Sequence, residues 1–348
     1  MKFLALLLSS LLALVAMLPL SAHAAQRGLA WGTNDNWGPA VAKGLIKWYW
    51  HWQDGPNSRF NGILEFVPCY WGPKYNSQWA QRKNEMNANP PKALLGFNEP
   101  DISGQSNLDP QTAANLWMQE IQPWKKRGVR LGSPQIVWNQ DWLASFMSAC
   151  KSKGCTVGRR SASTAQSSLS FNKPDTVVEE LCFFLIELGS DADALSFCLL
   201  TTDFIAIHWY GSWADLAGLQ RYVTSVRNRF GLPIWITEYG VTSASGGSQQ
   251  QIKQFHIDAT NWLNSQSYVE RTSNFGSFPY SSPPDAYGSR LNALFNGDGS
   301  LRDLAYWYIW TGNSARRSLR SETSTAEDDF EHTSEEIPIQ DKPASFNH

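Results

Sequence analysis

Residues 94–101 read LLGFNEPD, an apolar run that ends in an amide, a carboxylate, a proline and a second carboxylate. Leu94, Leu95 and Phe97 give this stretch the composition of a buried strand. A buried carboxylate without partners is costly, so Glu99 at the end of such a strand must be hydrogen-bonded, exposed or functional. The stretch therefore predicts a strand whose carboxyl end carries chemistry.

Short apolar runs of this kind recur along the chain, bounded by Gly, Pro, Asn or Asp, with helical patterns between several of them. The expected strands are 28–32, 45–52, 63–72, 93–101, 129–138, 203–211, 232–240 and 268–276. The expected helices are 77–87, 109–127, with Pro110 in its first turn, and 216–230.

The order of these elements predicts the fold. Strands that alternate with helices and carry continuous rather than alternating hydrophobicity indicate a parallel sheet covered by helices. Eight such units close into an α/β (β/α)8 TIM barrel, so we expect a single catalytic domain of that class. A doubly wound open sheet is the alternative, but no GxGxxG or GxxxxGK[ST] loop follows the first run.

Chemistry in such barrels lies at the carboxyl ends of the strands, and Glu238 in LPIWITEYG ends the seventh run as Glu99 ends the fourth. Strands four and seven of a closed barrel face each other across the lumen. Hydrolysis of an acetal needs a proton donor and a negative group beneath an oxocarbenium-like centre. We therefore expect Glu99 to be the general acid/base and Glu238 the nucleophile. The gap between the two decides between retention and inversion, and the sequence alone leaves it open.

Neighbouring residues suggest support for both carboxylates. The amide of Asn98 could hold a sugar 2-hydroxyl, and apolar surroundings would raise the pKa of Glu99. Glu238 would be kept ionised by Tyr239 or by a residue at the end of the sixth strand. The sixth run ends in HWYG, and we expect His208 and Tyr210 to orient the carboxylates or bind sugar hydroxyls. Asp101 is expected to cap the following turn.

The composition favours a carbohydrate ligand. The chain contains 17 Trp, 11 Tyr and 17 Phe, and flat aromatic rings stack on the apolar faces of sugars. We expect sugar platforms at four strand-end or late tryptophans, with core packing as the alternative for each: Trp71, Trp138, Trp209 and Trp310. Lys plus Arg is 29 against 31 for Asp plus Glu, so no basic field indicates a nucleic acid partner.

The ends of the chain indicate its processing. Residues 1–24 have a positive start, an apolar stretch and an Ala-His-Ala exit, which predicts a secretory signal peptide; a membrane anchor is the alternative. No second stretch has spanning length, so we expect a secreted protein without membrane association once the signal is removed. Residues 314–348 are polar and are expected to be disordered.

The cysteines predict one small loop and no metal. Cys150 and Cys155 are close enough in sequence to form a disulfide in a secreted protein, while Cys69 lies in an apolar run and is expected to be a buried thiol. No CxxC pair or matching His cluster occurs, so we expect neither a metal nor a cofactor. We expect a monomer.

Four motifs, in their order, resemble those of secreted fungal proteins of glycoside hydrolase family 128: GFNEPD, LGSPQIVW, DFIAIHWYG and PIWITEYG. The resemblance covers roughly residues 27–311. It implies a (β/α)8 barrel of the large retaining clan that acts on β-1,3-glucan, with the acid/base at Glu99 and the nucleophile at Glu238.

The sequence departs from the family in three places, one of which is the polar tail 314–348. Residues 158–202 stand where the family runs almost directly into the sixth strand, and we interpret them as an insertion or a translated intron within a domain of residues 25–313. The eighth run, VERTSNFG, lacks the aromatic residue that the family tends to carry after VER.

The sequence thus predicts a secreted, endo-acting, retaining β-1,3-glucanase that binds a glucan polysaccharide or oligosaccharide. Two alternatives stay open. One is a non-catalytic protein of the fungal cell wall that binds β-glucan on the same barrel, because fold alone does not prove activity. The other is an enzyme acting on a different β-glycan, such as β-1,4-mannan or cellulose.

Overall fold

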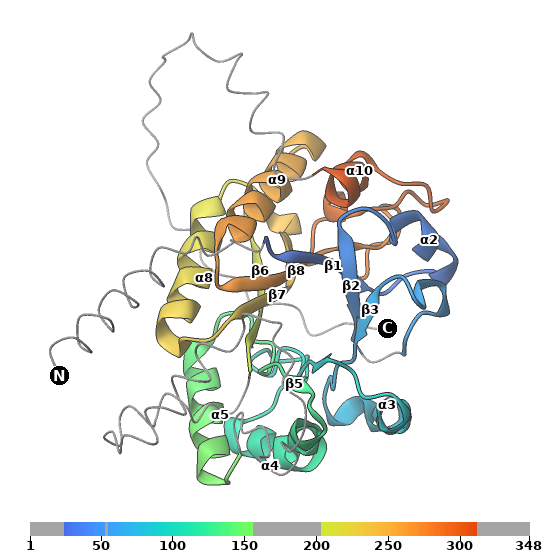
Figure 1. The fold of residues 1–348 in the computed structure, drawn as a ribbon. Helices are drawn as coiled ribbons and strands as arrows, with labels where there is room; N and C mark the ends of the chain where they lie inside the picture. Colours follow the sequence, from blue (N-terminus) through green and yellow to red (C-terminus); the bar gives the residue numbers. More distant parts are fainter. Residues whose placement is uncertain (1–23, 53–54, 156–202, 312–348) are drawn as a thin grey trace, which may run out of the picture.

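The structure, a computed structural model, describes residues 24–52, 55–155 and 203–311 (Figure 1). The signal peptide, the segment 158–202 and the tail 314–348 predicted above lie wholly or almost wholly outside these residues.

Parallel strands form the centre of the described molecule. Six make one sheet in the order β3-β2-β1-β8-β7-β6, and every neighbouring pair in it is parallel. Their bounds are Gln26–Trp31 (β1), Ile46–His51 (β2), Glu65–Val67 (β3), Ile205–Gly211 (β6), Ile234–Val241 (β7) and Val269–Ser277 (β8). Two short strands, β4 (Ala93–Leu94) and β5 (Arg130–Leu131), form a second parallel sheet.

Isolated parallel bridges lie between the two sheets. Cys69 pairs with Leu95 beyond the ends of β3 and β4, and Gly132 pairs with Phe204 between β5 and the start of β6. The predicted α/β fold with parallel strands is confirmed, whereas the eight strands do not form one continuous ladder, so the closed barrel is not shown. Pro68 and Pro134 interrupt the third and fifth runs, and a proline cannot donate to a ladder.

Helices surround the strands (Figure 1). Their bounds are Gly38–Val41 (α2), Asn76–Ala88 (α3), Pro110–Glu120 (α4), Gln140–Ser152 (α5), Leu216–Phe230 (α8), Gln249–Ser265 (α9) and Asp303–Trp310 (α10). Short 3-10 helices occur at Asp35–Trp37 (η1), Ser58–Phe60 (η2), Pro73–Tyr75 (η3), Gln122–Arg127 (η4), Ser243–Ser245 (η5) and Arg290–Asn292 (η6).

The predicted elements agree with the observed ones in position. Each of the eight runs overlaps a strand, and α8 has the bounds expected from the sequence. The helix expected over 109–127 divides into α4 and η4, because Pro123 cannot continue an α-helix. Pro110 is the first residue of α4, and the carboxylate of Asp109 accepts from the backbone N–H groups of the first turn.

Both faces of the strands are buried, as their continuous hydrophobicity predicts. Every residue of β7 is buried. One face packs against the helices, and the other packs an aromatic-rich cluster that includes Trp48, Trp50, Phe204 and Trp235. Gly28 makes room for this cluster, since a Cβ there would lie 2.3 Å from the Trp48 ring. Close packing of large rings fixes the strands around the centre.

The cysteine predictions can be compared directly with the structure. Cys150, near the end of α5, forms a disulfide with Cys155, and Cys69 is a buried free thiol. Within the described ranges, no helix is both long enough and apolar enough to cross a membrane.

Candidate active site

Neighbouring segments hold the backbone of Glu99 in an unusual conformation. Its φ angle is +43°, in the left-handed region that non-glycine residues seldom adopt. The backbone N–H of Glu99 donates to Gln135 O (2.9 Å), and that of Asn98 donates to Trp71 O (3.0 Å). A conformation of this kind costs on the order of 1–3 kcal/mol and persists where surrounding structure enforces it, often at functional sites.

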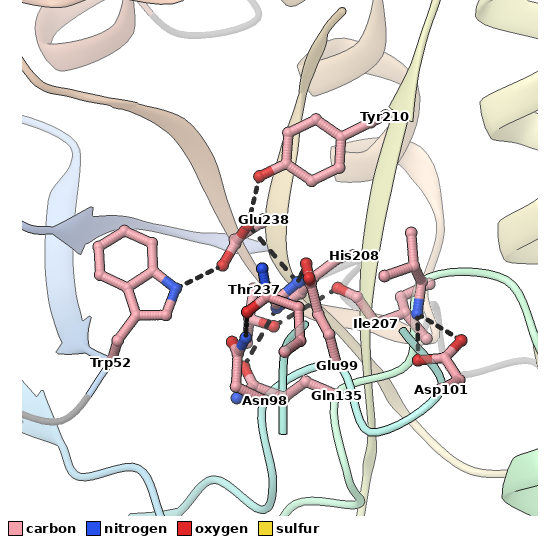
Figure 2. Close-up of polar contacts among 12 residues, drawn as sticks. Trp52, Asn98, Glu99, Asp101, Gln135, Ile207, His208, Tyr210, Thr237 and Glu238 are labelled. Carbon is pink, nitrogen blue, oxygen red and sulfur yellow. Dashed lines mark hydrogen bonds and ion pairs between the residues drawn. The ribbon is translucent and has the colours of Figure 1, made fainter. Parts of the chain in front are cut away.

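His208 and Glu238 lie side by side on neighbouring strands. They are register partners on β6 and β7, and the register shifts between Ile207 and His208. Such an irregularity re-aims a side chain near the end of a strand. The shift places the His208 ring and the Glu238 carboxylate on the same side of the sheet, toward Glu99 (Figure 2).

The two predicted catalytic carboxylates meet at one imidazole nitrogen. His208 Nδ1 lies 2.7 Å from Glu99 Oε1 and 3.5 Å from Glu238 Oε2. One ligand atom from each of the three side chains can be chosen so that all lie within 4.8 Å of one another. All three side chains are fully buried. The carboxylates therefore share one small polar centre, as their positions on strands four and seven predict.

Two donors hold the carboxylate of Glu238. Trp52 Nε1 donates to Glu238 Oε1 (2.8 Å), and the hydroxyl of Tyr210 donates to Glu238 Oε2 (Figure 2). Burial, and then the Glu238 and Glu99 carboxylates, raise the pKa of Tyr210 well above its usual value. Tyr210 therefore remains a phenol donor, and hydrogen bonds to an ionised carboxylate favour its charged form.

The same three side chains are the described residues whose ligand atoms suit a metal ion. Two ligands of a tetrahedral zinc ion, with bonds of about 2.0–2.1 Å, lie roughly 3.3 Å apart. The 2.7 Å between His208 Nδ1 and Glu99 Oε1 is shorter and matches a hydrogen bond. The arrangement fits a shared proton better than two ligands of one ion.

Other predicted residues lie near this centre. Asn98 is buried, and its Nδ2 donates to Gln105 Oε1 (3.2 Å). Trp71 is buried with its ring edge-on to Tyr75, and Trp138 is half-buried after β5. These residues follow the third, fourth and fifth strands, at the same end as the carboxylates.

Trp209 and Trp310 are not brought to the carboxylates. Trp209 points away from His208 and Tyr210 and stacks on Phe255 of α9 (5.4 Å between centroids). Side chains alternate along a strand, so a residue between two site residues faces the helices. Trp310 ends α10, where its ring stacks on Tyr306, and the preceding residue Ile309 accepts from the backbone N–H of Leu45 just before β2. Core packing, the alternative, describes the position of Trp209, whereas Trp310 is 46% exposed and lies neither in the core nor at the carboxylates.

Asp101 caps a different segment from the one expected. Its carboxylate accepts from the backbone N–H groups of Val137, Trp138 and Asn139, just before α5, rather than from the turn after it. Burial raises the pKa of Asp101 in spite of these bonds. Tyr239, a predicted partner of Glu238, contacts Thr260 of α9 instead.

Two residues of the centre were not predicted. Trp52 contacts Glu238 across 186 positions of sequence, and Gln135 Oε1 lies 3.4 Å from His208 Nε2. Their place in the sequence gave a weak signal, since both lie toward the carboxyl ends of expected strands. Trp52 ends the second run, and Gln135 lies in the fifth.

Comparisons with known proteins bear on this centre. A family model described as "Glycosyl hydrolase catalytic core" matches residues 28–164 and 192–308. Alkali-sensitive linkage protein 1 of Schizosaccharomyces pombe is 30% identical over 308 residues, which is 83% of this chain and 45% of that protein. The chain thus spans less than half the length of this relative.

Solved structures share the fold. A subgroup I endo-β-1,3-glucanase of family GH128 from Amycolatopsis mediterranei, in complex with laminaripentaose, is 26% identical with a TM-score of 0.56. It covers 82% of this chain and 99% of its own. A subgroup III curdlan-specific exo-β-1,3-glucanase from Blastomyces gilchristii, in complex with glucose, is 25% identical with a TM-score of 0.56. It covers 82% of this chain and 97% of its own.

Proposed function

Since the chain belongs to the glycosyl hydrolase catalytic core family, we propose that it hydrolyses β-1,3-glucan with Glu99 as general acid/base and Glu238 as nucleophile. One observation carries the proposal. Both carboxylates, from segments far apart in sequence, lie at the same nitrogen of His208, at 2.7 and 3.5 Å. Acetal hydrolysis needs two carboxyl groups in different environments on one reacting centre.

The proposed outcome is retention of configuration. Retaining glycosidases place their two carboxyl groups about 5–5.5 Å apart, whereas inverting enzymes leave roughly 6.5–9.5 Å for a water molecule. The chosen atoms of Glu99 and Glu238 lie within 4.8 Å, which supports the shorter class. An inverting reaction would need a wider gap to admit its attacking water.

The environments of the two carboxylates support their proposed roles. Glu238 accepts from Trp52 and Tyr210, two donors that stabilise an ionised nucleophile. Glu99 faces a nitrogen of His208 that can share a proton with it, as a general acid requires. Glu238 attacks C1 as Glu99 protonates the leaving oxygen, and water then releases the sugar with Glu99 as base.

The substrate class is proposed from the relatives together with the site. Similar structures were solved with laminaripentaose, laminarihexaose and laminaritriose bound. We propose endo action on β-1,3-glucan, although both endo- and exo-acting enzymes occur among these relatives. Early products from laminarin separate the two modes, since endo cleavage gives a range of oligosaccharides and exo cleavage gives one small product.

We also propose that the strands close into a (β/α)8 barrel. The bridges Cys69–Leu95 and Gly132–Phe204 support this, because they lie where the two-stranded sheet would join the six-stranded sheet. A closed ring would place the ends of strands four and seven across one hollow.

Secretion to the cell wall or medium of a fungus, as a monomer, completes the proposal. It rests on the sequence of residues 1–24 and on the resemblance to a yeast protein. Expression of the full gene in a yeast tests it. The mature protein should appear in the wall or medium with an amino terminus after Ala24, and intracellular retention with residues 1–24 intact would contradict it.

Carboxylate-to-amide variants test the catalytic roles. Glu99→Gln and Glu238→Gln should each lower the release of reducing ends from laminarin at least 1,000-fold, on the order of 4 kcal/mol in the barrier, while binding of laminari-oligosaccharides survives. A wild-type protein that binds laminarin and releases no sugar would instead support a non-catalytic glucan-binding protein. Assays on β-1,4-mannan and cellulose check the linkage.

A further inference from the structure

We propose that Gln135 is a positioning residue that fixes His208 in its Nε2–H form and thereby keeps a transferable proton on the Glu99–His208 pair. The inference rests on the proposed function, because it assigns the source of the proton that Glu99 delivers. It concerns a residue that touches neither the reacting bond nor the nucleophile.

The orientation of the Gln135 amide follows from its neighbours. Nε2 of Gln135 lies 3.3 Å from the carbonyl oxygen of Gly96, which can only accept a hydrogen bond. The NH2 group must therefore face Gly96, which turns Oε1 toward His208. The reversed amide would set two oxygens against each other in a buried place, at the cost of an unsatisfied pair.

The thiol of Cys69 agrees with this orientation. Burial raises the pKa of Cys69, so the thiol stays protonated. Its S–H donates to Gly96 O (3.4 Å), and its sulfur accepts from Gln135 Nε2 (3.3 Å). Both neighbours of the NH2 group are acceptors.

The amide in turn determines the protonation of the imidazole. Gln135 Oε1 lies 3.4 Å from His208 Nε2 and carries only lone pairs, so Nε2 must carry a hydrogen. The other nitrogen, Nδ1, lies 2.7 Å from Glu99 Oε1. Either Glu99 is protonated and donates to a neutral imidazole, or an imidazolium donates to the Glu99 carboxylate. In both forms the pair has no net charge, and one proton lies between His208 Nδ1 and Glu99 Oε1.

That proton is the one a general acid needs. In the first step it moves from Glu99 to the glycosidic oxygen as the bond from that oxygen to C1 breaks, and C1 bonds to an oxygen of Glu238. In the second step water attacks C1, gives its proton to Glu99 and displaces Glu238. The Nε2–H form leaves a lone pair on Nδ1 that accepts from protonated Glu99, so the imidazole does not favour the ionised form of Glu99 before the first step.

Other ionisable groups around the pair have hydrogen-bond partners of their own or are kept neutral by burial. Glu238 of β7 is held by two donors, Tyr210 of β6 remains a phenol, and Cys69 after β3 remains a thiol. Asp101, after β4, is bonded to three backbone N–H groups. Compared with these four groups, the Glu99–His208 pair is the one whose atoms are positioned to exchange a proton.

Gln135→Met, which keeps the length of the side chain and removes the acceptor, tests the proposal. His208 can then carry its hydrogen on Nδ1 and donate to the Glu99 carboxylate, which favours the ionised form and lowers the pKa of Glu99. The basic limb of kcat/KM on laminarin should move to lower pH by about one unit, with a roughly tenfold loss at pH 7. On dinitrophenyl β-laminaribioside, whose leaving group needs no proton, the rate should stay within about threefold of wild type.

Ser133→Ala is the matched control. Ser133 is buried on the same segment, and its hydroxyl accepts from the backbone N–H of Ala206 without contact to His208. This variant should lose stability and keep the wild-type basic limb. An unchanged basic limb in Gln135→Met, or equal losses on both substrates, would overturn the proposal.

A second readout does not depend on activity. Nitrogen NMR of histidine-labelled wild-type protein should show a proton on Nε2 of His208, assigned by the loss of its signals in His208→Asn. A deprotonated Nε2 would overturn the proposal even in an active enzyme. If the wild type releases no sugar from laminarin, the proposed function fails, and this measurement still decides where the proton lies.

Discussion

At the scale of single residues, the donors around Glu238 determine how readily it stays ionised. Tyr210→Phe removes a hydroxyl that donates to Glu238 Oε2 and preserves the ring. A hydrogen bond to a charged group contributes about 1.5–3 kcal/mol, so kcat/KM should fall roughly 10- to 100-fold. The pKa of Glu238 should rise because its charged form loses a donor, and the acid limb of the pH profile should move to higher pH.

Tyr239→Phe is the control for this variant. Tyr239 is the neighbour of Glu238 on β7, but its hydroxyl contacts Thr260 on the helix side (2.7 Å). We expect a small loss of stability and an unchanged acid limb. Equal shifts of the acid limb in the two variants would show that the effect comes from general loosening of the strands.

The sequence predicts the residues of this centre whose polar type is unusual at the end of an apolar strand. It does not predict those that join the centre only through long-range contacts. Glu99, Glu238, His208 and Tyr210 stand out because polar groups rarely end apolar strands. Gln135 does not, because its role depends on a contact across 73 positions. Side chains alternate between the two faces of β6. If His208 faces the site, its neighbour Trp209 must therefore face the helices.

At the scale of elements, Asp101 links the segment after β4 to the start of α5. Asp101→Ala should leave three backbone N–H groups without their acceptor and lower the free energy of unfolding by about 2 kcal/mol. The melting temperature should then fall by roughly 4–8 °C. Activity should also fall, because Glu99 lies two residues away on the same segment.

Asp141→Ala provides the comparison. Asp141 lies in the first turn of α5 and pairs with Arg229 through a side chain that is 88% exposed. Surface ion pairs contribute little, so its melting temperature should stay within about 2 °C of wild type. Similar losses in both variants would show that the three N–H contacts of Asp101 add nothing beyond a surface charge.

The extent of each strand depends on features that hydrophobicity does not report. The third, fourth and fifth runs were expected to be long, yet β3, β4 and β5 are two or three residues each. Proline removes donors in two of these runs, and the chain after β4 turns into the left-handed conformation at Glu99. Apolar patterns locate strands well and predict their hydrogen-bonded length poorly.

At the scale of the whole molecule, one buried histidine should make the stability of the fold sensitive to acid. Burial lowers the pKa of His256 from 6.5 to about 4, and Nε2 lies 2.9 Å from Asn292 Oδ1. The unfolded chain binds a proton near pH 6.5 and the folded chain does not until about pH 4, so stability is lost as pH falls through that window.

The loss attributable to His256 should be about 2 kcal/mol between pH 7 and pH 5. His256→Gln removes the titrating group and retains a donor for Asn292. Urea unfolding of both proteins at pH 7 and pH 5 measures how far the free energy of unfolding falls between the two pH values. This fall should be about 2 kcal/mol smaller in the variant than in the wild type. An identical pH dependence would place the acid sensitivity elsewhere.

The overall class of the fold follows from the order of the apolar runs, and the family follows from the motifs at their ends. The link between the two sheets rests on single bridges such as Gly132–Phe204, which no sequence pattern specifies. The pairing of His208 with Glu238 follows a register shift after Ile207, which the sequence does not reveal either.

The anomeric form of the first product tests the central claim most directly. Proton NMR can follow the hydrolysis of laminarihexaose by the wild-type protein before mutarotation equilibrates the product. If Glu99 and Glu238 act on one sugar from within 4.8 Å, the β-anomer must appear first. Initial release of the α-anomer, or no release at all, would contradict the proposed pair.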